Sequence, residues 1–76
     1  MKRYFLIRTA DDERNASYKK ICSTYEEAVK EVPKYADWWS SYGTCSIHEV
    51  DENFLIYKVY KFANGSQISV VVWKEG

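Results

Sequence analysis

The dipeptide Asn64-Gly65 constrains the fold of this chain more than any other local feature, because of the two segments it joins. These segments, FLIYKVYKF (54–62) and QISVVVW (67–73), are rich in β-branched and aromatic residues. Asn-Gly is strongly preferred in type I′ turns, where both central residues need positive φ and the turn matches the twist of the flanking strands. The sequence therefore predicts an antiparallel hairpin at the C-terminal end.

Earlier segments extend this hairpin into a sheet. TCSIHEV (44–50) has the composition of a strand and is separated from the hairpin by the turn residues 51–53. RYFLIRT (3–9) is a further strand by the same criterion, and a charged, turn-forming segment follows it. The sequence leaves open whether YKKIC (18–22) forms a short additional strand beside 3–9. We therefore expect an antiparallel sheet of about four strands.

One helix is predicted between these strands, from its capping residues and its apolar periodicity. Ser23 with Glu26, and Thr24 with Glu27, form two overlapping capping boxes, in which a hydroxyl and a carboxylate satisfy free backbone N–H groups. Apolar residues then recur at steps of three and four, as one face of a helix requires. This stripe consists of Tyr25, Ala28, Val29, Val32, Tyr35, Ala36 and Trp39.

Pro33 lies within the predicted helix and should kink it, because proline removes one helical hydrogen bond and clashes with the preceding turn. Gly43 is the expected end of the helix, since glycine tolerates the left-handed conformation found there. The whole chain, residues 1–76, is then predicted to form a single two-layer α+β domain. Its element order is β(β)αβββ, with the kinked helix on one face of the sheet.

The charges of the chain balance, with 11 basic and 11 acidic residues. Such a chain has no global field to attract nucleic acid or an anionic membrane, and no apolar run approaches the ~20 residues of a membrane span. Cys22 and Cys45 are too few for a disulfide framework, and the N-terminal segment turns polar after a few apolar residues. We therefore expect a cytoplasmic protein with reduced cysteines and neither a membrane nor a nucleic acid as partner.

Residues with reactive side chains gather in segment 44–52, but the strand pattern separates them. Cys45 and His48 are three residues apart, and an odd separation places two side chains on opposite faces of a strand. Neither cysteine belongs to a Cys-x-x-Cys pair, and no glycine-rich phosphate loop is present. Glu49, Asp51 and Glu52 are typical of a solvated corner beside a turn. We therefore expect no enzymatic activity, no metal ion and no cofactor.

Apolar residues occur on both sides of the predicted strands, although one helix can cover one face of a sheet. The uncovered side is either a scatter of exposed residues, which is common, or a contiguous patch for a second copy, a protein partner or a stacked ligand. We favour the patch, and with it a homodimer. Its members are Tyr4, Leu6, Leu55, Tyr57, Val59, Val71 and Trp73.

Trp38 and Tyr42 extend the expected binding surface, because an exposed indole beside a tyrosine is a frequent anchor in interfaces. Covering the end of a short helix is the alternative role of Trp38. The full set of predicted binding residues is Tyr4, Leu6, Arg8, Trp38, Tyr42, Tyr57, Val59, Lys61 and Trp73.

The motifs TYEEA, YADWW, GTC and EVDENF, within residues 24–54, resemble a loose set of small uncharacterised proteins of phages, prophages and their Gram-positive hosts. In these proteins a capped helix with a similar aromatic end precedes a glycine, a cysteine-bearing strand and a valine-aspartate turn. The resemblance implies a context: such small proteins often bind and block a host protein, including components of anti-phage defence, or sequester a signalling molecule. It transfers no site residue.

The sequence therefore favours a non-catalytic binding protein, a phage or mobile-element accessory factor that inhibits or redirects a host protein in the host cytoplasm. The alternative is a protein that sequesters a small nucleotide-like ligand. In that alternative, aromatic residues stack on a base and basic residues meet phosphates. The aromatic residues would be Tyr4, Tyr57 and Trp73, and the basic ones Arg3, Arg8, Lys58 or Lys61.

Overall fold

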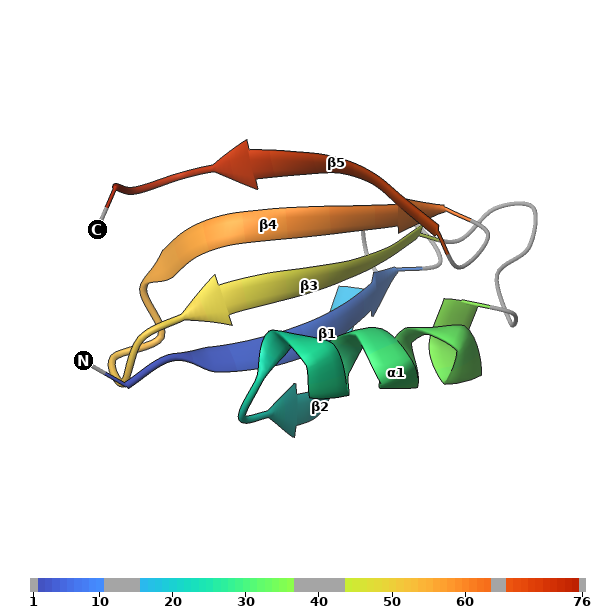
Figure 1. Ribbon diagram of the computed structural model, residues 1–76, viewed down its shortest axis with the longest axis horizontal. Helices are drawn as coiled ribbons and strands as arrows, with labels where there is room; N and C mark the ends of the chain where they lie inside the picture. The colour runs from blue at the N-terminus through green and yellow to red at the C-terminus, as the bar shows by residue number, and fades with distance from the viewer. Residues whose placement is uncertain (1, 11–15, 37–43, 64–65, 76) are drawn as a thin grey trace.

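A five-stranded antiparallel sheet and one helix form the described part of the chain in a computed structural model (Figure 1). The described residues are 2–10, 16–36, 44–63 and 66–75. The elements are β1 (Tyr4–Ala10), β2 (Ala16–Cys22), α1 (Tyr25–Ala36), β3 (Thr44–Val50), β4 (Ile56–Ala63) and β5 (Ser66–Val72). The strands lie in the order β2-β1-β3-β4-β5, so β2 and β5 are the edges.

This arrangement confirms the predicted α+β class and adds a strand to the sheet. The segment whose structure the sequence left open is the full-length strand β2, paired antiparallel with β1. Ala63 pairs with Ser66 across the last hairpin, so Asn64 and Gly65 lie between the strands as predicted. These two residues themselves lie outside the described residues.

Capping fixes the start of α1, as its sequence predicts. Thr24 Oγ1 accepts a hydrogen bond from the Glu27 backbone N–H at 3.1 Å, and the Glu27 carboxylate accepts one from the Ser23 N–H at 3.3 Å. Pro33 lies inside α1 and does not end it, because the helix continues to Ala36. The predicted end at Gly43 lies outside the described residues.

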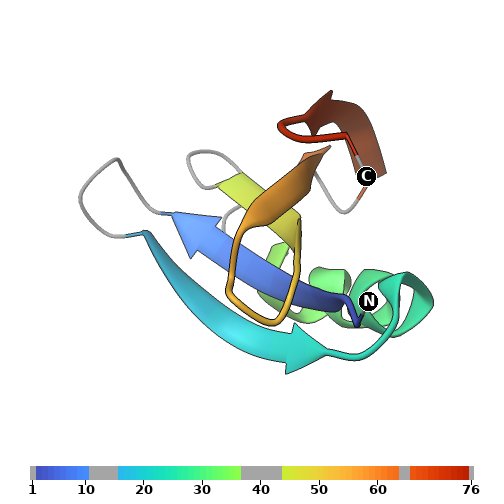
Figure 2. The ribbon, with the colours of Figure 1, turned by 90° about the vertical axis from the view of Figure 1, so that its left-hand side faces the viewer.

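The main core lies between α1 and one face of the sheet (Figure 2). Ala28 and Val32, from the predicted apolar stripe, are fully buried there. An ion pair ties the helix to the edge strand, with Lys20 Nζ on β2 lying 2.7 Å from a Glu31 oxygen on α1. The sheet supplies the remaining buried members of this core, which are Ile7, Cys22, Cys45, Ile47 and Phe62.

The opposite face of the sheet is partly buried as well, although no helix covers it in the described part of the chain. Strand register aligns one row of residues across all five strands: Ile21, Leu6, His48, Val59 and Val71. The three central members of this cross-strand row are 3%, 7% and 6% exposed, whereas its two ends are exposed. The sheet twists strongly (Figure 2), and the Tyr18 side chain from the edge strand β2 reaches His48 at the centre of this face.

The predicted apolar patch is therefore wrong in three of its members. Leu6 and Val59 are buried members of the cross-strand row. Tyr57 is buried for another reason: the Arg3 guanidinium lies 3.7 Å from its ring centroid, and its hydroxyl donates to Asp51. Leu55, Val71 and Trp73 are exposed, as the patch requires.

Asp51 organises the turn between β3 and β4, and its burial corrects the prediction of a solvated corner. Its Oδ1 accepts hydrogen bonds from the N–H groups of Asn53 at 2.8 Å and Leu55 at 3.2 Å. Its Oδ2 accepts one from the Tyr57 hydroxyl at 3.0 Å. Burial raises the pKa of Asp51, but these three hydrogen bonds outweigh that effect and hold the pKa below its ordinary value.

Phe54 occupies a left-handed conformation in this turn, with φ of 62°. That conformation is unfavourable for an aromatic residue. The backbone N–H of Phe54 donates a hydrogen bond to the Asp51 carbonyl at 3.0 Å. Residues 52 and 53 form the turn, and β4 begins at Ile56 and not at residue 54 as predicted.

Replacing Asp51 by alanine should destabilise the protein, because two backbone N–H groups and a buried tyrosine hydroxyl lose their acceptor. We expect Asp51→Ala to lower the melting temperature by at least about 5 °C, measured by circular dichroism. The neighbouring exposed carboxylate provides the control, and Glu52→Ala should change the melting temperature by about 2 °C or less. Equal effects of the two substitutions would contradict this role of Asp51.

Candidate functional site

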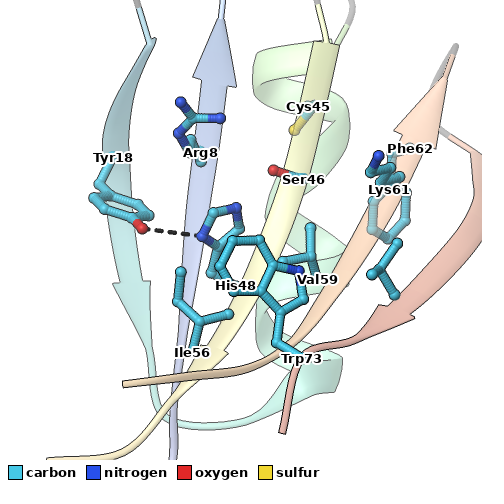
Figure 3. A pocket seen from close by; sticks show the side chains of 11 residues that line it. Arg8, Tyr18, Cys45, Ser46, His48, Ile56, Val59, Lys61, Phe62 and Trp73 are labelled. Carbon is cyan, nitrogen blue, oxygen red and sulfur yellow. Dashed lines mark hydrogen bonds between the residues drawn. The ribbon is translucent and has the colours of Figure 1, made fainter. Parts of the chain in front are cut away.

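A groove lies on the face of the sheet opposite α1 and has a volume of about 710 Å³. This volume is within the range of small-molecule sites, roughly 300–1,000 Å³. We call it the open-face groove, and Figure 3 shows its lining. The lining residues are Arg8, Tyr18, Cys45, Ser46, His48, Ile56, Val59, Lys61, Phe62, Val71 and Trp73.

Tyr18 and His48 form the polar centre of the groove. A hydrogen bond of 2.9 Å joins Tyr18 Oη to His48 Nδ1, and the two rings meet edge to face with centroids 5.4 Å apart. The tyrosine reaches over from the edge strand β2, whereas the histidine stands on the central strand β3 (Figure 3). This contact fixes the orientation of the imidazole and covers one side of it.

The imidazole of His48 is neutral at physiological pH. Burial, with a smaller contribution from the Arg8 charge, lowers the pKa of His48 to about 4. Burial likewise raises the pKa of the Cys45 thiol to about 11, and Cys45 belongs to the helix-side core. Near neutral pH the groove therefore holds neither an imidazolium nor a thiolate.

Two basic residues flank Ser46 at one end of the groove. Register places Ser46 on β3 opposite Arg8 on β1 and opposite Lys61 on β4, so one hydroxyl lies between two cationic side chains. With neighbouring strands about 4.8 Å apart, the two basic residues are anchored roughly 10 Å from each other. Among the described residues, neither cation forms an ion pair with an acidic side chain. This end of the groove suits an anionic group.

Apolar and aromatic side chains form the other end of the groove. Figure 3 shows Trp73 and Ile56 below His48, with the indole directed toward the histidine and Val59. Trp73 is 63% exposed, so most of its ring surface is available for contact with another molecule. The groove thus has a cationic, hydroxyl-bearing end and an aromatic end, separated by the Tyr18–His48 pair.

The open-face groove brings together four of the predicted binding residues: Arg8, Val59, Lys61 and Trp73. Leu6 lies in a second, neighbouring hollow that also contains Tyr18 and Phe54. Tyr4 and Tyr57, which were predicted to stack on the base of a ligand together with Trp73, do not line this groove. Trp38 and Tyr42 lie outside the described residues.

Sequence reasoning missed the hydroxyl and imidazole groups of the groove, which belong to Tyr18, Ser46 and His48, and it also missed Cys45, Ile56 and Phe62. The alternation of β3 does place Ser46 and His48 on one face, two residues apart, so this part of the signal was present in the sequence. Tyr18 could not be assigned to the site, because its position depends on the pairing of β2 with β1.

Comparisons with known proteins do not add to this description, because the sequence matches no protein-family model, no curated protein and no solved structure. In the described ranges, no helix has the length and apolarity needed to cross a membrane. Within the same ranges, no three His, Cys, Asp or Glu side chains are grouped as ligands for a metal ion.

The low pKa of His48 makes a prediction about stability. The imidazole of His48 becomes protonated near pH 6.5 in the unfolded chain and near pH 4 in the folded protein. The stability that depends on this group is therefore full above about pH 6.5 and falls as the pH is lowered toward 4. Between pH 7 and pH 5 we expect a loss on the order of 1–2 kcal/mol. Urea denaturation at a series of pH values measures it.

The matched control for this prediction is His48→Gln, which removes the titrating group and keeps a hydrogen-bonding side chain beside Tyr18. Its free energy of unfolding should change much less over the same interval, which lies above the range where most carboxylates titrate. A wild-type profile as flat as that of the variant would show that His48 does not titrate abnormally.

Proposed function

We propose that this protein is a non-catalytic binding protein that sequesters a small, nucleotide-like ligand in the open-face groove. The observation that carries the proposal is the pair of cationic side chains, Arg8 and Lys61, on either side of the Ser46 hydroxyl. Charge-assisted hydrogen bonds from such groups are the usual means of holding a phosphate. The exposed indole of Trp73 at the other end offers a flat surface on which a base can stack.

The chemistry of the groove favours binding over catalysis. An imidazole whose pKa is about 4 is a weak base near pH 7, and the hydrogen bond described for it goes to Tyr18 and not to Ser46. The Cys45 thiol remains protonated, since its pKa is about 11. A bound phosphate would therefore meet fixed donors, with neither a strong base nor an activated nucleophile beside it.

A protein partner is the second candidate, and the turn after β3 favours it. Phe54 and Leu55 are 61% and 50% exposed, and Asp51 holds the turn that presents them. A fixed, exposed aromatic residue is typical of an interface anchor. In this candidate the protein is an accessory factor that inhibits or redirects a host protein, such as a component of anti-phage defence, as the resemblance to small phage proteins implies.

Calorimetric titration with adenosine monophosphate tests the ligand proposal, with adenosine as the probe that lacks the phosphate. We expect the monophosphate to bind more tightly than the nucleoside. Arg8→Gln and Lys61→Gln should each weaken monophosphate binding by about tenfold, because each removes one charge-assisted contact. Lys58→Gln is the matched control: Lys58 is on β4 with Lys61 but is not a groove residue, so its replacement should leave affinity unchanged.

Native mass spectrometry of the purified protein extends this test to ligands other than adenosine monophosphate. A retained phosphate-bearing molecule that is lost in Arg8→Gln supports the groove as its site. The ligand proposal fails if no small molecule is retained and no nucleoside monophosphate binds at millimolar concentration. Capture of a host protein that depends on Phe54, tested with Phe54→Ser, would then favour the second candidate.

A further inference from the structure

The edge strand β5 has an unusual composition for a strand with one free side. In the described sheet it pairs with β4 and with no other strand. Free edges are generally protected by lysine, proline or a charged residue that prevents pairing with another chain. The opposite edge strand, β2, carries Lys19 and Lys20. The segment 66–73, SQISVVVW, contains neither a charged residue nor a proline.

The hydrogen bonds of β5 show which backbone groups face its free side. Directly after the last pair of the β4–β5 ladder, the Trp73 N–H donates to the Tyr57 carbonyl at 2.8 Å, so the backbone of Trp73 is directed toward β4. Hydrogen-bonded and non-hydrogen-bonded pairs alternate along an antiparallel ladder, and Val72 pairs with Lys58 and Val70 with Tyr60. The backbone groups of Val70 and Val72 are therefore directed away from β4, toward the free edge.

The side chains of β5 suit pairing with another strand. Val70, Val71 and Val72 are 41%, 39% and 50% exposed, a run of branched side chains on both faces of the strand. Pairs of β-branched residues on adjacent strands stabilise a sheet. Backbone direction, side-chain type and lack of charge thus all favour extension of the sheet at β5.

We propose that β5 pairs antiparallel with β5 of a second copy of this chain, so that the two sheets become one continuous sheet. A strand without charges meets no like charge when it lies against itself, and the chain has a formal net charge of zero. An antiparallel pair of identical strands has two-fold symmetry, so the assembly closes as a dimer. This inference does not depend on the ligand of the open-face groove.

The pairing has a direct consequence for the open-face groove. The two-fold axis of an antiparallel strand pair is perpendicular to the sheet, so the two copies present the same face on the same side. Val71 and Trp73, which line the groove, lie on or directly after β5. The two grooves of the dimer would therefore open on one side of the joined sheet, with the paired strands between them.

Sedimentation velocity over a concentration series tests the dimer. We expect the wild-type protein to reach the dimer mass at high micromolar concentration. Val70→Lys should give a monomer, because each paired strand then carries a charge near its own copy. The control is Ile21→Lys, the same change from a branched residue to lysine at an exposed position of the other edge strand, and it should remain dimeric.

Hydrogen exchange of the wild-type protein gives a second test, which does not depend on the folding of any variant. The Val70 and Val72 amides should become more protected as protein concentration rises, whereas the Val71 amide, directed toward β4, should change little. A wild-type monomer at every concentration overturns the proposal. A dimer whose Val70 amide stays unprotected, or a dimer that Ile21→Lys splits, also overturns it. The proposal fails as well if this edge becomes protected only when an unrelated peptide is added.

Discussion

The structure depends on how one short helix and five strands share the task of burying apolar surface. Helix α1 packs on one face of the sheet, over β1, β2 and β3, and Ile7, Ile47 and Val32 meet there without solvent contact. On the other face, Tyr18 from the edge strand β2 contacts His48, and Trp73, directly after the edge strand β5, lines the same groove (Figure 3).

Local sequence signals were sufficient for most of the secondary structure, because turns and caps depend on nearby residues. Thr24 and Glu27 marked the start of α1, and the strand 44–50 has the predicted bounds. The burial of Leu6 could not be predicted, since it depends on the twist of the whole sheet. The left-handed Phe54 was also missed, because no residue type at that position indicates it.

The same distinction between local and long-range signals applies to the residues of the groove. Arg8, Lys61 and Trp73 were expected to bind a ligand, and each lies in the groove, because alternation along a single strand gives the face of a side chain. The pairing of Tyr18 with His48 depends on contacts between residues far apart in the sequence, and alternation cannot supply those. Tyr57 was assigned incorrectly, since a register shift in the β3–β4 ladder lies beside it and its hydroxyl meets Asp51.

The two buried cysteines make the opening of the helix-side core measurable by thiol modification. Cys22 is on the edge strand β2 and Cys45 on the central strand β3, and both are free thiols buried in the core that α1 covers. A thiol reagent needs an accessible thiolate, so modification has to wait until the packing around each cysteine opens. The rates of modification at Cys22 and Cys45 would therefore report, without any added label, how often the edge and the centre of this core separate from the helix.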